Sequence, residues 1–188
     1  LNDWRVDNVT MSCMENMFQG ASAFDQNRNW GLTNEMLRDW VKRWCGGDRS
    51  LPPISTWNTS RVTDMSKLFH GKSKFNDDIS TWDTSSVTTM SNMFWNAKSF
   101  NRPLSNWRVD KVTDMSHMFS CAKSFNQPLN DWCVDNVTNM RGMFSCVRYD
   151  QAGEIRTVIR GSSFNQPLND WRVDNVTDMR EMFAYASS

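Results

Sequence analysis

The sequence WDTSSVTTMSNMFWNAKSFNRPLSN, residues 82–106, decides the fold, because close copies of it fill most of the 188-residue chain. Each copy begins with a tryptophan. The regular copies begin at Trp57, Trp82, Trp107 and Trp132, spaced by 25 residues, a further copy begins at Trp171 after 39 residues, and a variant begins at Trp4. Such a period is typical of an array whose units bury their apolar faces only against their neighbours.

One stretch of each repeat predicts a short helix. Its apolar residues follow one another at intervals of 3, 3, 1 and 3, which keeps them on one helical face. In the repeat at Trp82 they are Val87, Met90, Met93, Phe94 and Ala97. Residues whose side-chain oxygen can cap a helix N-terminus precede this stretch in every repeat. They are Asp7, Ser60, Ser85, Asp110, Asp135 and Asp174.

A short strand is expected ahead of the predicted cap. Leu104, Trp107 and Val109 have polar residues between them, and the last two follow the two-residue period of a strand. Each 25-residue coil is therefore expected to hold one short parallel strand and one short helix, an α/β repeat. In the return loop an asparagine follows a phenylalanine, as at Asn101, and we expect its amide to bond backbone groups that stacking would bury.

Residues 28–53 interrupt the period and predict a boundary. Apolar residues with helical spacing form one face there: Leu37, Trp40, Val41 and Trp44. Thr33 or Asn34 can cap this helix, and Gly46 can end it. We expect the helix to cover the open edge of the first repeat, since terminal repeats need a cap. The alternative is a helix that docks a partner.

The chain is thus predicted to have three parts. Residues 1–30 would be the tail of a preceding array, residues 31–53 a capping helix with its connector, and residues 54–188 the main repeat array. An insertion at 147–160, VRYDQAGEIRTVIR, interrupts the main array and resembles nothing else in the chain. It is either a surface loop grown for binding or a translated stretch of unspliced intron.

The words VTDMSxMF and FNQPLxxW, as in VTDMSHMF at 112–119 followed by FNQPLNDW at 125–132, resemble the BspA-type leucine-rich repeat. The similarity is to the 25-residue variant found in mycoplasma surface lipoproteins and unicellular eukaryotes. It implies a leucine-rich-repeat-like right-handed solenoid that serves adhesion or protein recognition at the cell surface or outside the cell. The resemblance implies no catalytic residue.

Composition excludes several classes of function. With 21 basic and 21 acidic residues the chain has no net field for nucleic acid, and no apolar run is long enough to insert into a membrane. The two histidines, His70 and His117, occupy different repeat positions, so we expect no enzyme, metal site or cofactor. Cys121 and Cys146 lie one period apart, which permits a disulfide but equally fits two partly buried thiols.

The residues flanking each tryptophan are expected to face outward if the tryptophan points into the core. One predicted column is Asn58, Asp83, Arg108, Cys133 and Arg172, and the other is Thr56, Thr81, Asn106, Asp131 and Asp170. Side chains that differ from repeat to repeat on a constant backbone are typical of a recognition surface. The sequence therefore favours a non-catalytic interaction or adhesion module for a protein or glycan partner. The alternative is a structural spacer or linker subunit in a larger assembly.

Overall fold

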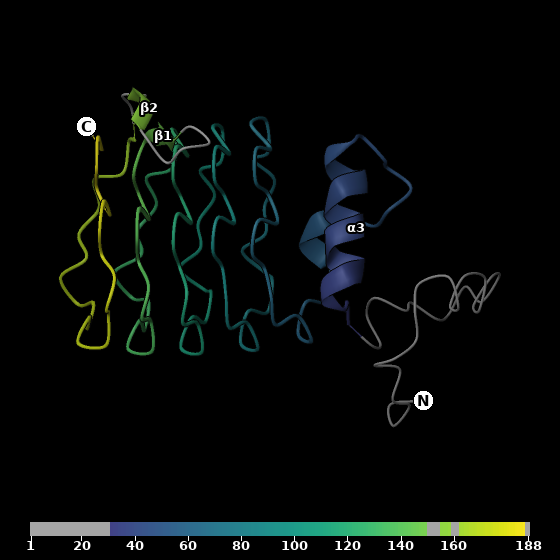
Figure 1. The fold of residues 1–188 in the computed structure, drawn as a ribbon. Coiled ribbons are helices and arrows are strands. Elements are labelled where there is room, and N and C mark those ends of the chain that lie inside the picture. The colour runs from purple at the N-terminus through teal and green to yellow at the C-terminus, as the bar shows by residue number, and fades with distance from the viewer. Residues whose placement is uncertain (1–30, 150–154, 159–161, 187–188) are drawn as a thin grey trace.

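The computed structural model describes residues 31–149, 155–158 and 162–186. The repeats stand side by side in a row, with helix α3 (Asn34–Cys45) at the N-terminal end of the row (Figure 1). A short 3-10 helix, η1 (Ile54–Thr56), precedes the first regular repeat. The tail of a preceding array predicted at residues 1–30 lies outside the described residues.

The fold class predicted from the sequence, an α/β leucine-rich-repeat-like right-handed solenoid, is wrong. Within the described ranges α3 is the single α-helix, and no repeat contains a helix or a strand. The two strands found there, β1 (Val147–Tyr149) and β2 (Ile155–Val158), pair antiparallel within the inserted segment. Whether this insertion is a binding loop or a gene-model artefact stays a prediction.

Left-handed backbone explains why the predicted helix is absent. Asn92 and Asn96 both have φ of 57°, whereas an α-helix of L-residues needs right-handed φ throughout. Hydrogen bonds from Met93 N–H to Met90 C=O (3.1 Å) and from Ala97 N–H to Phe94 C=O (2.9 Å) close two successive turns instead. Two turns of this kind give the apolar residues the same 3, 3, 1, 3 spacing that a helix would.

Backbone hydrogen bonds join neighbouring repeats in the stretch where the helix was predicted. Isolated parallel bridges link Asp64, Thr89, Asp114, Asn139 and Asp178 in succession. Alternate N–H groups donate to the following repeat, as Met65 does to the Thr89 carbonyl (3.1 Å) and Phe69 to the Met93 carbonyl (2.9 Å). No strand forms at Leu104, Trp107 and Val109, where one was predicted.

The tryptophans form a buried column, as the sequence predicts. Trp57, Trp82, Trp107 and Trp132 are 2–3% exposed, and Trp171 is 9% exposed. The rings of Trp57 and Trp82 stack with centroids 6.0 Å apart. Each indole N–H donates to a backbone carbonyl, as Trp107 does to that of Ile79 in the preceding repeat (3.1 Å) and Trp57 to that of Pro52 (2.9 Å), so burial leaves none of these indole donors unpaired.

The asparagine column has the predicted role. The N–H of Asn101 donates to the side-chain oxygen of Asn76 (3.0 Å), and Asn126 and Asn165 repeat this bond along the row at 3.0 and 2.8 Å. The return loops have irregular backbone, so these amides supply acceptors that a sheet would otherwise provide.

Helix α3 lies against the edge of the first repeat. Thr33 is its N-cap, and Met36, Leu37 and Val41 are buried. Trp40 and Trp44 meet Trp57 edge to face, with ring centroids 5.2 and 5.9 Å away. The tryptophan column is therefore covered by aromatic rings at this end, although the division of the chain into three parts stays a prediction.

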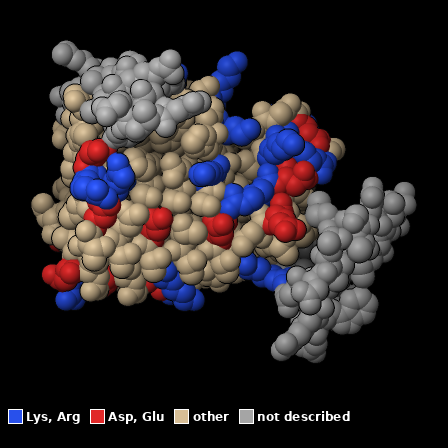
Figure 2. Space-filling model, in the orientation of Figure 1, with Lys and Arg blue, Asp and Glu red and all other residues tan. Residues whose placement is uncertain are grey.

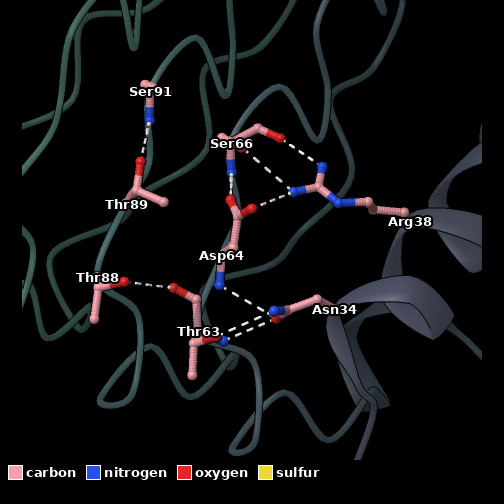
Figure 3. Close-up of polar contacts among 8 residues, drawn as sticks. All are labelled: Asn34, Arg38, Thr63, Asp64, Ser66, Thr88, Thr89 and Ser91. Carbon is pink, nitrogen blue, oxygen red and sulfur yellow. Dashed lines mark hydrogen bonds and ion pairs between the residues drawn. The ribbon is translucent and has the colours of Figure 1, made fainter.

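Polar side chains of α3 also satisfy the backbone of that edge (Figure 3). The Asn34 side-chain oxygen accepts from the N–H groups of Thr63 (2.9 Å) and Asp64 (3.2 Å). Further along the row the Thr113 carbonyl accepts the corresponding pair of bonds, from Thr138 and Asn139. The amide of Asn34 thus replaces the carbonyl of a missing repeat.

A candidate binding face beside the tryptophan column

We call the two columns of residues that flank the core tryptophans the Trp-flanking face. Nine of its ten members are exposed, and Asn58 is half-buried. The members are Thr56, Asn58, Thr81, Asp83, Asn106, Arg108, Asp131, Cys133, Asp170 and Arg172. Their outward direction follows from the extended backbone at Trp57 (φ −71°, ψ 129°), because successive side chains of an extended chain point to opposite sides. The next residues inward, such as Thr84 and Val109, are accordingly buried.

Two members of this face support the adjoining turn. An Asp83 carboxylate oxygen accepts from the N–H of Ser85 (2.9 Å), and hydrogen bonding from Ser85 holds the pKa of Asp83 below its ordinary value. The Asn58 side-chain oxygen accepts from the N–H of Ser60 (3.1 Å) in the same way. Ser60 and Ser85 were predicted to cap helices, which is wrong because the turn that follows is not a helix.

The side chains of the two arginines of the face are largely exposed to solvent. The side chain of Arg108 is 67% exposed and lies 3.3 Å from Asp110, and that of Arg172 is 76% exposed. Arg172 Nε lies 3.9 Å from carboxylate oxygens of both Asp135 and Asp174. Exposed ion pairs contribute about 0–1 kcal/mol, so either arginine can exchange its carboxylate for a partner's at little cost.

A hollow of about 250 Å³ opens on this face between the repeats of Trp132 and Trp171. Its lining residues are Asn130, Asp131, Trp132, Cys133, Val134, Asp135, Asp170 and Arg172. A second hollow of about 150 Å³ adjoins it and adds Asp174 and Asn175. The carboxylates outnumber the single arginine, so the two hollows together favour a cationic group.

The thiol in the larger hollow is not activated. Cys133 Sγ donates to a carboxylate oxygen of Asp135 (3.3 Å), and this hydrogen bond raises the pKa of the thiol. A nucleophile or metal ligand would need the opposite shift. Cys133 is therefore suited to contact rather than to chemistry.

The residues considered for catalysis do not come together. His70 stacks on Trp95 with ring centroids 4.4 Å apart, and Trp95 is half-buried. Burial lowers the pKa of both His70 and His117, aided by the charges of Lys67 and Arg141 respectively. Within the described part of the chain, no three His, Cys, Asp or Glu side chains are grouped to hold a metal ion.

A hollow of about 320 Å³ lies at the junction of α3 with the first repeat, and sequence reasoning missed it. Its lining residues are Trp44, Cys45, Arg49, Lys72, Ser73, Lys74, Phe75 and Asp77. The Asp77 carboxylate accepts from the Trp44 indole (2.8 Å), so three cations face one carboxylate that already has a partner. In Figure 2 basic and acidic side chains lie intermixed at the α3 end, while much of the surface over the repeats is uncharged.

Comparison with known proteins gives one match, to a family model. The family model described as "Mycoplasma protein of unknown function, DUF285" matches residues 1–40, 45–156 and 156–188. No curated protein matches the chain, and no solved structure does. Among the residues that the structure describes, no helix is long and apolar enough to cross a membrane.

Proposed function

We propose that this chain, which belongs to the DUF285 family of Mycoplasma proteins of unknown function, is a non-catalytic protein-interaction or adhesion module. BspA-like repeat proteins are associated with that family, and membership is consistent with a surface-associated protein. The module binds through the Trp-flanking face. Its ligand is a protein that presents a lysine or arginine side chain.

The acid-lined hollow between the repeats of Trp132 and Trp171 carries the proposal. It lies on the columns whose side chains change from repeat to repeat, while the tryptophans between them do not change. Asp131 and Asp170 are exposed at its rim, and Arg172 with Asp135 forms one side. A cationic side chain that entered the hollow would replace the long contact between Arg172 and Asp135 with shorter bonds to carboxylates.

Selection from a random peptide display library on the immobilised chain tests the proposal. We expect enrichment of peptides that contain clustered Lys or Arg, and about tenfold weaker binding of these peptides to an Asp131→Asn, Asp170→Asn double variant. Arg108→Glu with Arg172→Glu should also change the affinity, since it alters the charge of the same face.

The matched control reverses two charges elsewhere. Lys74→Glu with Lys98→Glu changes the net charge by the same amount as the arginine pair, on exposed residues outside the Trp-flanking face. This control should bind the selected peptides like the original chain. Equal binding by every variant, with unchanged thermal unfolding, would exclude the Trp-flanking face as the contact surface.

One observation favours the alternative function, a spacer or linker subunit that makes contacts through its ends. Val173, Met179, Phe183 and Tyr185 expose large apolar side chains on the last described repeat. A spacer would bind through this end and would tolerate both the aspartate and the arginine variants. The same binding series therefore separates the two functions.

A further inference from the structure

Two cysteines of neighbouring repeats meet in the interior. The sulfur atoms of Cys121 and Cys146 lie 3.2 Å apart, and the two residues are 1% and 0% exposed. Their backbones are held in place by bonds between repeats, from Cys121 N–H to the Ser145 carbonyl (2.8 Å) and from Cys146 N–H to the Ala184 carbonyl (3.0 Å). Neighbouring chains joined in this way lie about 5 Å apart, within the Cα separation that a disulfide accepts.

This sulfur pair is specific to one place in the row. The corresponding positions of other repeats hold Gly71, Asn96 and Tyr185, which cannot form such a link. Cys146 also directly precedes strand β1, so the pair lies where the inserted segment leaves the repeat. Of the other cysteines that the structure describes, Cys133 is exposed and bonded to Asp135, and Cys45 is at the α3 junction.

We propose that Cys121 and Cys146 are a redox modification site that forms a disulfide between adjacent repeats in the presence of a small-molecule disulfide such as oxidised glutathione. The thiolate of one cysteine attacks the small disulfide, which gives a mixed disulfide and releases one small thiol. The thiolate of the second cysteine then attacks the protein sulfur of the mixed disulfide and releases the second small thiol. Each protein sulfur is oxidised by one electron, the small disulfide is reduced by two, and the two protein protons end on the two small thiols.

The burial of the pair determines how the reaction proceeds. The sulfurs must approach from 3.2 Å to about 2.05 Å, which side-chain rotation can achieve without moving the backbones out of register. The oxidant reaches them only when the repeat beyond Cys146 opens. In that repeat Phe183 and Tyr185 are exposed, whereas Phe144 and Cys146 at the corresponding positions are buried, so less packing is lost when it opens.

The disulfide would stabilise the end of the described row opposite to α3. It closes a loop of 25 residues, from Cys121 to Cys146, and restricts the unfolded chain. The expected result is a rise in Tm on the order of 5 to 10 °C. The inference does not rest on the proposed binding function, because Cys121 and Cys146 are not part of the Trp-flanking face. Only the Cys133→Ser control changes a residue of that face.

The experiment equilibrates the full chain with glutathione at oxidising and reducing ratios, blocks remaining thiols, and maps linked peptides by mass spectrometry. We expect a peptide that joins Cys121 to Cys146, a mass of this peptide about 2 Da below the sum of its two reduced components, and the rise in Tm. The Cys133→Ser control should show all three results, and Cys121→Ser and Cys146→Ser should show none of them.

Several outcomes would overturn the inference. They are a chain that carries glutathione at Cys133 but no link between repeats, a link that joins other cysteines, or an equal rise in Tm in the Cys121→Ser variant. If a serine variant fails to fold, the peptide map of the unmodified chain still decides whether the link forms.

Discussion

The two edges of the repeat row that the structure describes differ in their contacts. At the N-terminal end Asn34 and Arg38 of α3 bond the backbone of the first repeat, and Trp40 and Trp44 pack on its tryptophan. At the C-terminal end Phe183 is 49% exposed, and large apolar side chains face solvent. A repeat here is not stable by itself, because the neighbour supplies both its hydrogen-bond partners and much of its apolar burial.

The backbone also gives the two ends opposite requirements. In the stretch represented by residues 65–71, N–H groups point to the following repeat and carbonyl groups to the preceding one. In this stretch the N-terminal edge therefore needs a donor, which Arg38 supplies to the Ser66 carbonyl (2.6 Å), whereas at Thr63 and Asp64 the same edge needs the acceptor that Asn34 supplies. The C-terminal edge needs acceptors instead, and the N–H groups of Met179 and Phe183 have none among the described residues.

The largest expected difference concerns the tryptophan column. Trp107 lies between two repeats and is 3% exposed, whereas Trp171 belongs to the last described repeat. Trp107→Ala should lower the free energy of unfolding by about 3–5 kcal/mol, and Trp171→Ala by less than half of that, because fewer neighbours lose contacts. Urea unfolding followed by circular dichroism measures both losses. Equal losses would show that the last described repeat is packed like an internal one.

The hydrogen bonds made by Asn34 of α3 are expected to contribute less to the free energy of unfolding than burial of Trp107 does. Asn34→Ala removes the acceptor for two backbone N–H groups and should lower the free energy of unfolding by about 1–3 kcal/mol. Asn34→Asp keeps that acceptor and loses only the donor to Thr63 Oγ1 (3.1 Å), so it should retain most of the stability. The cap has no such role if the alanine variant unfolds at the urea concentration of the original chain.

Acid should weaken the capped end. Burial alone would raise the pKa of Asp64, but hydrogen bonds from Ser66 and the charge of Arg38 outweigh it and hold the pKa below 3.8. The unfolded chain then binds a proton that the folded chain does not, so this contribution is present above pH 3.8 and is lost as the pH falls through the lower folded pKa. Asp64→Asn should show a smaller fall in Tm between about pH 4 and pH 2 than the original chain.

Asp39→Asn is the control for this pH series. Asp39 lies on α3 next to Arg38, and its carboxylate is 3.8 Å from Arg43 with both side chains well exposed. The control should keep the acid dependence of the original chain. If the pH profile of Asp64→Asn equals that of the original chain, this carboxylate does not contribute to the acid sensitivity of the capped end.

The smallest effect on the free energy of unfolding is expected in the last described repeat. Tyr185 is 46% exposed and has a left-handed φ of 58°, a conformation that asparagine accepts more readily than tyrosine. Asn96 holds the corresponding position of an internal repeat with φ of 57°. Tyr185→Asn should therefore change the free energy of unfolding by no more than about 0.5 kcal/mol. A loss comparable to that of Asn34→Ala would mean that this end is covered in solution.

The period and the buried column could be predicted because tryptophan and asparagine recur at fixed intervals, as at Trp107 and Asn101. The absence of a helix within the repeats could not be predicted, because two successive turns give the apolar residues the same spacing as a helix. Glycine at 71 and 142 and asparagine at 96 mark left-handed positions and could have warned against it, but Lys67 and His117 adopt the same φ without any such sign.

The candidate site was predictable in part for a similar reason. Alternation about the tryptophans predicted the exposed columns, since it needs only an extended backbone at that point. The acid-lined hollow was not predicted, because Asp135 and Asp174 were assigned to helix caps that do not exist. The hollow also requires that the repeats of Trp132 and Trp171, which the insertion separates in the sequence, lie next to each other in the structure.

Amide hydrogen exchange, resolved by residue, tests most directly whether backbone bonds between repeats hold this molecule together. Internal donors such as Met90 N–H, which bonds the Asp114 carbonyl (3.0 Å), and capped donors such as Thr63 N–H should exchange slowly. Met179 and Phe183 N–H should exchange nearly as fast as in an unfolded chain. Fast exchange at Met90, or equal protection at the two ends of the row, would contradict the account.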